Sequence, residues 1–148
     1  MIMKKFVFSL QSWYDMQLGI EKQHKLQIGI IEAKINACRD ELAELGRCFD
    51  RTKEEFFGEV SQGMIAHRAN HYGSFFDTTK ATMAAVTDQM GKLEEEKAEW
   101  MQKLVLVRRD IKLLDKLRES QYSEYLAEVK KNQNKFVDDF VSYKVTIS

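Results

Sequence analysis

The stretch GMIAHRANHYGSFF, residues 63–76, interrupts a chain that otherwise has the character of continuous helix. Gly63, Asn70 and Gly73 lie within it, and both residue types lower the stability of a helix interior. Their clustering weakens a single continuous helix at this point. The sequence therefore predicts that the chain reverses direction here, through a connector at about residues 63–71.

The composition favours long helices on both sides of this connector. The 148 residues include no proline and many Leu, Ile, Met, Ala, Glu and Lys, which is typical of long helices. The 23 basic and 23 acidic residues balance to a net charge of zero, which disfavours nonspecific binding to nucleic acid. We expect an all-α protein with no nucleic-acid partner.

Apolar residues recur at alternating steps of three and four on each side of the connector, which is the spacing of a coiled coil. The first stripe consists of Ile28, Ile31, Ile35, Cys38, Leu42, Leu45, Phe49, Thr52 and Phe56. The second stripe consists of Tyr72, Phe76, Thr79, Met83, Val86, Met90, Leu93, Lys97, Trp100, Leu104, Val107, Ile111 and Leu114. Each stripe predicts a helix that buries one face.

The two stripes match when the chain folds near Ala66. The polar residue Thr52 of the first stripe then lies opposite the polar residue Thr79 of the second, and Phe56 faces Phe76. Further predicted pairs are Phe49 with Met83, Leu42 with Met90, Cys38 with Leu93 and Ile28 with Leu104. This coincidence favours an antiparallel hairpin within one chain over a parallel dimer of one long helix.

The predicted fold is thus all-α, a long two-helix antiparallel coiled-coil hairpin that forms one domain over residues 1–148. The first helix is expected at about 8–62 and the second at about 72–142. Residues 143–148 are expected to form a C-terminal tail.

The match between the stripes degrades toward the termini. Continued backwards, the first stripe meets three polar residues, Gln17, Glu21 and His24. Two explanations stay open: an outside partner that covers the apolar residues left exposed, or a stutter that turns inward Trp13, Leu18 and Ile20. Beyond the second stripe, helical spacing without an internal partner continues in Phe136, Val137, Phe140, Val141 and Tyr143. A functional partner and simple fraying are both open for this segment.

His67 and His71 are four residues apart, a spacing that zinc sites use on a helix face. No glutamate follows His67 and no third ligand lies nearby, so we interpret both as surface histidines. Cys38 and Cys48 are ten residues apart in one helical segment, beyond disulfide reach. A two-helix coil also encloses no substrate pocket. The sequence therefore predicts no catalytic residue, metal site, cofactor or small-molecule substrate, and no enzyme.

Three segments of the chain resemble flagellar FliJ-type proteins. They are MKKFVFSLQSWYDM (3–16), the tip stretch quoted above, and LDKLRESQYSEYLAEVKKNQNKFVDDF (114–140). The ending departs from the family, which more often has Leu-Asp-Glu where this chain has FVDDF. The resemblance covers the whole chain and implies a helical, noncatalytic component of the flagellar type III protein export apparatus.

The resemblance also implies partners and a location. The end that carries both termini inserts into the hexameric export ATPase ring, and the tip binds the cytoplasmic domain of the membrane export gate. Export chaperones are further family partners. The protein is then cytoplasmic, peripherally associated with the inner face of the cell membrane, and a monomer in isolation. An N-terminal apolar run that Ser9 and Gln11 cut short of signal-peptide length agrees with the cytoplasm.

Residues are assigned to these contacts by position. Candidates for the export gate are Phe75, Tyr72 and Leu45, of which Tyr72 and Leu45 also lie on the stripes and are candidates for the core. Candidates for the ATPase ring are Leu10, Trp13, Phe136 and Phe140. Two other functions stay open, the analogous stalk of a virulence-type secretion system and a self-assembling structural coiled coil.

Overall fold

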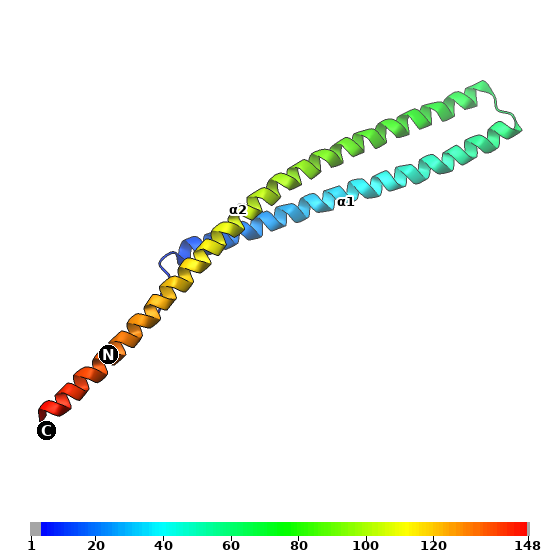
Figure 1. Ribbon diagram of the computed structural model, residues 1–148. Coiled ribbons are helices and arrows are strands. Elements are labelled where there is room, and N and C mark those ends of the chain that lie inside the picture. The colour runs from blue at the N-terminus through cyan, green and yellow to red at the C-terminus, as the bar shows by residue number, and fades with distance from the viewer. Residues whose placement is uncertain (1–3, 148) are drawn as a thin grey trace. The chain divides into compact units, whose positions relative to one another are not determined.

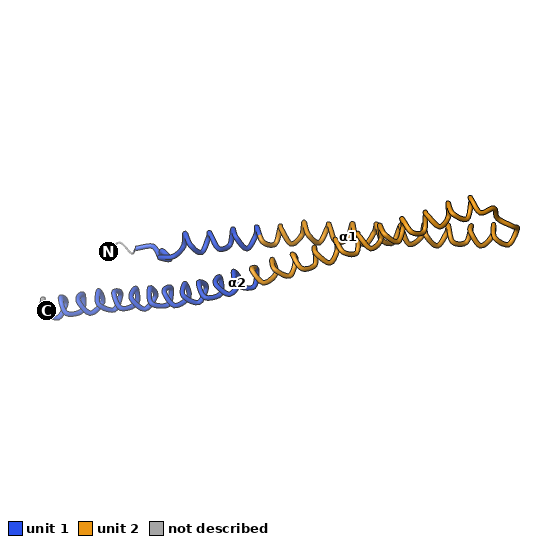
Figure 2. The backbone as a smooth tube through the Cα atoms, turned by 90° about the horizontal axis from the view of Figure 1, so that it is seen from above, with its two compact units in different colours: residues 1–23, 104–148 blue, residues 24–103 orange. Residues whose placement is uncertain are grey.

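The computed structural model describes residues 4–147, which form two long helices and no strand in that range (Figure 1). Helix α1 spans Gln11–Gln62 and helix α2 spans Ala66–Ile147. The described residues divide into two compact units (Figure 2). Unit 2 is His24–Lys103, and unit 1 comprises the described residues on either side of it. The prediction of an all-α helical hairpin is confirmed.

In unit 2, α1 and α2 lie side by side and run in opposite directions from their connection (Figure 1). Their interface is made by the two predicted stripes. Ile31 is only 1% exposed, and every other stripe position within the unit is buried or half-buried. The stripes therefore bury each other within one chain, as expected for the hairpin and not for a parallel dimer of one helix.

Ring and charge contacts define the register in unit 2. The predicted pair Phe56 and Phe76 is confirmed, with ring centroids 5.9 Å apart. Phe56 also meets Tyr72 at 5.3 Å, and Lys97 reaches Glu32 at 3.4 Å. The pair Phe56 and Phe76 is centred on Ala66, as predicted, whereas Phe56–Tyr72 is centred on Met64 and Glu32–Lys97 between Met64 and Ile65, near the middle of the connector.

The connector consists of Gly63, Met64 and Ile65. Gly63 has a φ of +92°, a left-handed conformation that L side chains rarely adopt, and its N–H donates to the Val60 carbonyl over 3.2 Å. This is a glycine cap that ends α1. Helix α2 starts at once, because the Ile65 carbonyl accepts hydrogen bonds from the N–H groups of Arg68 and Ala69.

The predicted connector at 63–71 was therefore too long, and Asn70 and Gly73 lie inside α2. Each costs a helix about 1 kcal/mol or less relative to alanine. Packing of the first turns of α2 on α1, through Tyr72 and Phe76, outweighs this cost.

The helix ends also differ from the prediction. Helix α1 begins at Gln11 rather than near residue 8, because Phe8 is drawn into the core, where it is 4% exposed. Residues 4–10, here called the N-terminal strap, precede it without helix. Helix α2 continues to Ile147, past the predicted tail boundary, since nothing after Gly91 breaks it and Lys144 suits its last turn. Ser148 lies outside the described residues.

Unit 1 solves the poor match near the N-terminus without a stutter. Glu21 and Gln17 stay on the interface and are half-buried, and Arg108 pairs with Glu21 at 3.3 Å. The Tyr14 hydroxyl donates to Asp115 over 2.8 Å. Trp13 remains 46% exposed and Leu18 38% exposed, whereas Ile20 is half-buried, so of the two explanations left open the stutter fails for Trp13 and Leu18. Glu21 and Tyr14 of α1 instead find polar partners on α2, in Arg108 and Asp115.

Candidate partner-binding surfaces

An aromatic cluster closes the tip end of unit 2. Its members are Phe49, Phe56, Phe57, Tyr72, Phe75 and Phe76. The centroid of Phe76 lies 5.1 Å from that of Phe49 and 5.8 Å from that of Phe75. These rings knit α1 to α2 close to the point where the chain reverses.

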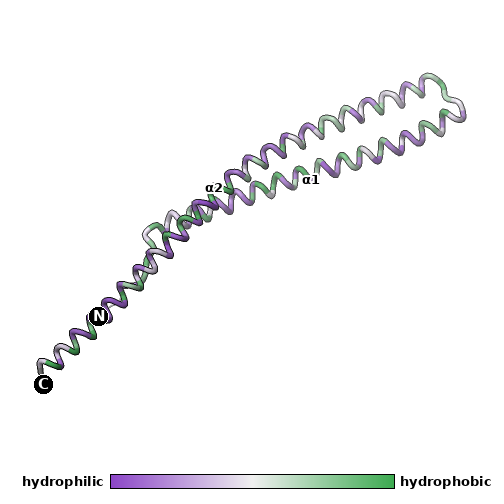
Figure 3. The backbone as a smooth tube through the Cα atoms, in the orientation of Figure 1, coloured by the Kyte–Doolittle hydropathy of each residue, from purple (hydrophilic) through white to green (hydrophobic). Residues whose placement is uncertain are grey.

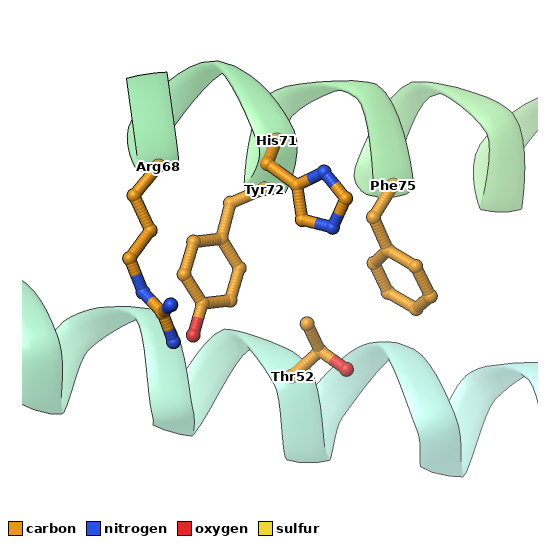
Figure 4. A pocket seen from close by; sticks show the side chains of 5 residues that line it. All are labelled: Thr52, Arg68, His71, Tyr72 and Phe75. Carbon is orange, nitrogen blue, oxygen red and sulfur yellow. The ribbon is translucent and has the colours of Figure 1, made fainter. Parts of the chain in front are cut away.

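An open pocket lies beside this cluster, lined by Thr52 of α1 and by Arg68, His71, Tyr72 and Phe75 of α2 (Figure 4). Figure 4 shows Arg68, Tyr72 and Phe75 extending from α2 toward α1, and Thr52 extending back toward them. The wall therefore combines rings with a guanidinium, an imidazole and hydroxyl groups. It offers apolar area and hydrogen-bond donors together at the tip.

A charged pair holds one end of this pocket. Arg68 donates from Nε and Nη2 to the two carboxylate oxygens of Glu59, each over 2.6 Å. The hydrogen bonds from Arg68 lower the pKa of Glu59, and those to Glu59 raise the pKa of Arg68. Burial, with the hydrogen bond to Glu59, raises the pKa of Tyr72 above its usual 10.0. All three groups thus keep their ordinary neutral-pH charge.

The structure brings two of the three candidate gate residues together. Tyr72 and Phe75 line the same pocket, whereas Leu45 is half-buried on the α1 stripe and does not line it. Tyr72 also packs on Phe56 as a stripe residue. The Glu59–Arg68 pair was not anticipated from the sequence, and the signal for it was the opposite charge of two residues that flank the glycine of the connector.

In unit 1, the candidate residues fall into two places. Leu10 and Trp13 line one open, mostly apolar pocket, together with Asp110, Leu113, Leu114 and Leu117. Phe136 and Phe140 are not part of it. They lie further along α2 and are 62% and 53% exposed.

Phe136 and Phe140 belong to a longer row that we call the C-terminal stripe. Its members step alternately by four and three along α2: Tyr122, Leu126, Val129, Gln133, Phe136, Phe140 and Tyr143. Hydrophobic and hydrophilic residues alternate along this end of α2 (Figure 3). Residues 130–146 are exposed throughout. Counting backwards from Phe136 would have identified the first half of the stripe, which the sequence analysis missed.

The C-terminal stripe is out of phase with the hairpin stripe. Continued past Leu114, the hairpin stripe reaches Arg118, Gln121 and Tyr125, of which the last two lie one residue before Tyr122 and Leu126 of the C-terminal stripe. A second apolar face therefore starts where the hairpin interface ends.

The structure also gives the positions of the histidines and cysteines named in the sequence analysis. His71 lines the tip pocket and His67 is exposed. No group of three His, Cys, Asp or Glu residues that could hold a metal ion occurs among residues 4–147. Cys38 is buried and Cys48 half-buried, and both are free thiols. Neither described helix contains a stretch apolar and long enough to cross a membrane.

Comparison with known proteins identifies the family. The family model for the flagellar FliJ protein matches residues 7–146, which is nearly the whole chain. Neither the curated proteins nor the solved structures contain a match to this sequence. The family match spans both helices, the connector and the C-terminal stripe. The chain therefore belongs to the flagellar FliJ protein family, a family of structural, non-enzymatic components of flagellar protein export that work in the cytoplasm.

Proposed function

We propose that this chain is the stalk of the flagellar export apparatus whose unit 1 binds the export ATPase ring and promotes the ring's assembly and activity. The C-terminal stripe is the observation that supports this most. Phe136, Phe140 and Tyr143 expose more than half of their surface on a helix that stays exposed from residue 130 to 146. Large apolar side chains gathered on one face mark an interaction site.

The free energy that burial of the C-terminal stripe can supply supports a partner that binds along this helix. Full burial of one such side chain contributes about 1.5–3 kcal/mol. Several of them are needed to offset the cost of association, which is about 4 kcal/mol or more. The C-terminal stripe supplies them on one face, while Lys131 and Asp138 lie on the remainder of the helix surface and keep it hydrated.

The pocket of Leu10 and Trp13 adds a second contact for the same ring. Trp13 presents nearly half of its surface beside the apolar residues of the pocket. Tryptophan is strongly enriched among the residues that dominate binding energy at interfaces. We therefore assign both this pocket and the C-terminal stripe to the ATPase ring.

The tip pocket is our candidate for the cytoplasmic domain of the export gate. Phe75 is half-buried and lies at the edge of the aromatic cluster, so part of its ring can contact a partner without opening the hairpin. Tyr72 contributes its hydroxyl group to this contact. Leu45 lies on the α1 stripe and has at most a supporting role, through the packing of the hairpin. Peripheral association with the inner face of the membrane follows from this contact.

Export chaperones complete the proposed set of partners, on the family relationship alone. The free chain is proposed to be a monomer, because the hairpin stripes already bury each other. The family match favours the flagellar apparatus over a virulence-type secretion system. Burial of the stripes within one chain disfavours a structural coiled coil that assembles through them.

Equilibrium binding to the purified export ATPase tests the ring contact. The double variant Phe136→Ala and Phe140→Ala is expected to weaken binding at least about tenfold, because two exposed anchors are lost. Phe57→Ala is the matched control, since Phe57 is an exposed phenylalanine of unit 2 at 58% exposure. Absence of any binding by the unmodified chain, or equal affinity of all three chains, would overturn the assignment.

A further inference from the structure

The N-terminal strap packs against α2 at the start of the C-terminal stripe. The Phe6 ring meets Tyr122 edge-on at 5.1 Å and Tyr125 at 5.5 Å. Phe8 is buried and packs edge-on against Tyr14 of α1 at 6.4 Å. All of these residues belong to unit 1.

Polar contacts also hold the strap. The Tyr125 hydroxyl donates to the Lys4 carbonyl over 2.6 Å. Ser9 and Gln121 exchange hydrogen bonds between their side chains, the shorter of them 3.0 Å. Gln121 and Tyr125 continue the hairpin stripe beyond Arg118. At these positions the strap takes the place that α1 occupies along the earlier part of α2.

The two halves of the strap are held differently. The half near α1 contains Phe8, which is 4% exposed, and the helix start follows directly. In the outer half, residues 4–7, Phe6 is only half-buried and Val7 is 76% exposed. An open pocket remains next to the Phe6 ring, lined also by Asp115, Arg118, Glu119 and Tyr122. The outer half of the strap is thus held by the Phe6 ring and by the hydrogen bond from the Tyr125 hydroxyl to the Lys4 carbonyl.

Phe6 packs on part of the Tyr122 ring, which a partner of the C-terminal stripe would also contact. Tyr122 is the first member of the stripe, and its ring lies closer to Phe6 than the ring of Tyr125 does. A helix that lies along the stripe can pack on Leu126 and beyond without meeting the strap. Tyr122 is 47% exposed, so the helix reaches the free part of its ring, but to contact the part that Phe6 covers it must displace Phe6.

We propose that residues 4–7 of the strap are a displaceable cover that shields part of the first turn of the C-terminal stripe and is released when the export ATPase binds. The inference rests on the proposed ring contact. With the cover closed, Tyr122 is 47% exposed and Tyr125 half-buried, and with the cover open both rings gain the surface that Phe6 covers. Weakly held segments of this kind open with low free energy while the surrounding helices stay folded.

Such a cover lowers the apparent affinity of the stripe. If only a fraction of the molecules are open, the apparent Kd rises by the inverse of that fraction. A variant that favours the open state therefore binds the ATPase more tightly, although it has lost a side chain. This gain in affinity is opposite to the loss of affinity expected if Phe6 itself contacted the ATPase ring.

The test compares Phe6→Ala with Val7→Ala, a neighbour whose side chain is mostly exposed. Hydrogen exchange of the amides in residues 4–9 is expected to speed up in Phe6→Ala and to stay unchanged in Val7→Ala. Binding of the ATPase is expected to tighten about fivefold in Phe6→Ala, with unchanged helicity. Tyr125→Phe keeps the ring, removes the hydrogen bond to Lys4, and is expected to shift both readouts in the same direction by less.

The outcomes distinguish a failure of the proposed cover from a failure of the proposed contact with the ATPase ring. Equal or weaker binding by Phe6→Ala, with the unmodified chain still bound, would overturn the cover and leave the ring contact standing. Continued slow exchange of residues 4–9 in the unmodified chain after ATPase addition would do the same. Failure of every chain to bind would overturn the ring contact, and the cover with it.

Discussion

Arg68 holds Glu59 in a two-pronged hydrogen bond across the three-residue connector, with both N–O distances at 2.6 Å. This links the last turn of α1 to the first turn of α2 beside the glycine that ends α1. The pair stands next to the tip pocket, which Arg68 also lines. Integrity of the connector and the shape of the pocket therefore depend on the same guanidinium.

The pair should make the tip sensitive to acid. Arg68 lowers the pKa of Glu59 below the ordinary value of 4.5, so the contribution of Glu59 to stability is fully present above that value. It is lost as the pH falls through the lowered pKa of the folded state. Protection of the amides at residues 63–68 against hydrogen exchange, relative to the intrinsic rate at each pH, should fall over this acid range, and Glu59→Gln should remove the change. The same loss of protection in Glu59→Gln would exclude the pair as its cause.

The connector glycine should be irreplaceable, while a helical glycine nearby should not. Gly63→Ala is expected to lower the free energy of unfolding by about 1–2 kcal/mol, because alanine is strained at a φ of +92°. Gly73→Ala is expected to raise it by about 1 kcal/mol, since Gly73 lies inside α2 with no neighbouring atom within 4 Å of the added methyl. Urea denaturation measures both. A Gly63→Ala chain as stable as the unmodified one would contradict the assigned turn.

The His24 side chain has a buried polar atom. Its Nδ1 atom is buried without a hydrogen-bond partner among the described residues, and its ring meets Trp100 edge-on at 5.3 Å. His24→Phe keeps a ring there and removes the unsatisfied nitrogen, so the free energy of unfolding should rise by about 1 kcal/mol. His67→Phe, at an exposed position, should have little effect. Thermal melting of the two variants gives the comparison, and destabilisation by His24→Phe would show that Nδ1 has an unseen partner.

Two adjacent phenylalanines at the tip should separate binding from folding. Phe75→Ala should keep the helix content and weaken binding to the gate domain by about tenfold, because Phe75 lines the tip pocket. Phe76→Ala should mainly destabilise the hairpin, by about 3 kcal/mol or more, because Phe76 packs on Phe49 and Phe56. Circular dichroism and equilibrium binding distinguish them. Loss of fold in Phe75→Ala would place that ring in the core.

The hairpin could be predicted because its information is periodic. Ile28 to Phe56 and Tyr72 to Trp100 each repeat one spacing, and a helix must bury such a face. The exact turn could not be predicted in the same way. Gly63, Asn70 and Gly73 all oppose helix, and only the left-handed φ of Gly63 shows which of them ends it.

The surfaces were harder to predict than the interface. Trp13 and Phe75 were named as candidates for partner binding, and the structure has each lining an open pocket. The strap was beyond reach, because the place of Phe6 against Tyr122 depends on where α1 begins. Helix boundaries are set by individual hydrogen bonds, which leave little trace in a sequence pattern.

Every role assigned to these surfaces requires that α1 and α2 of one molecule pair with each other. Arg39 and Glu94 are exposed partners across unit 2, 3.7 Å apart, and can carry spin labels as cysteines in a chain whose Cys38 and Cys48 are replaced by serine. Dipolar spectroscopy should report label separations compatible with helix axes about 10 Å apart, unchanged when labelled chains are diluted with unlabelled ones. Coupling that vanishes on dilution would contradict the hairpin.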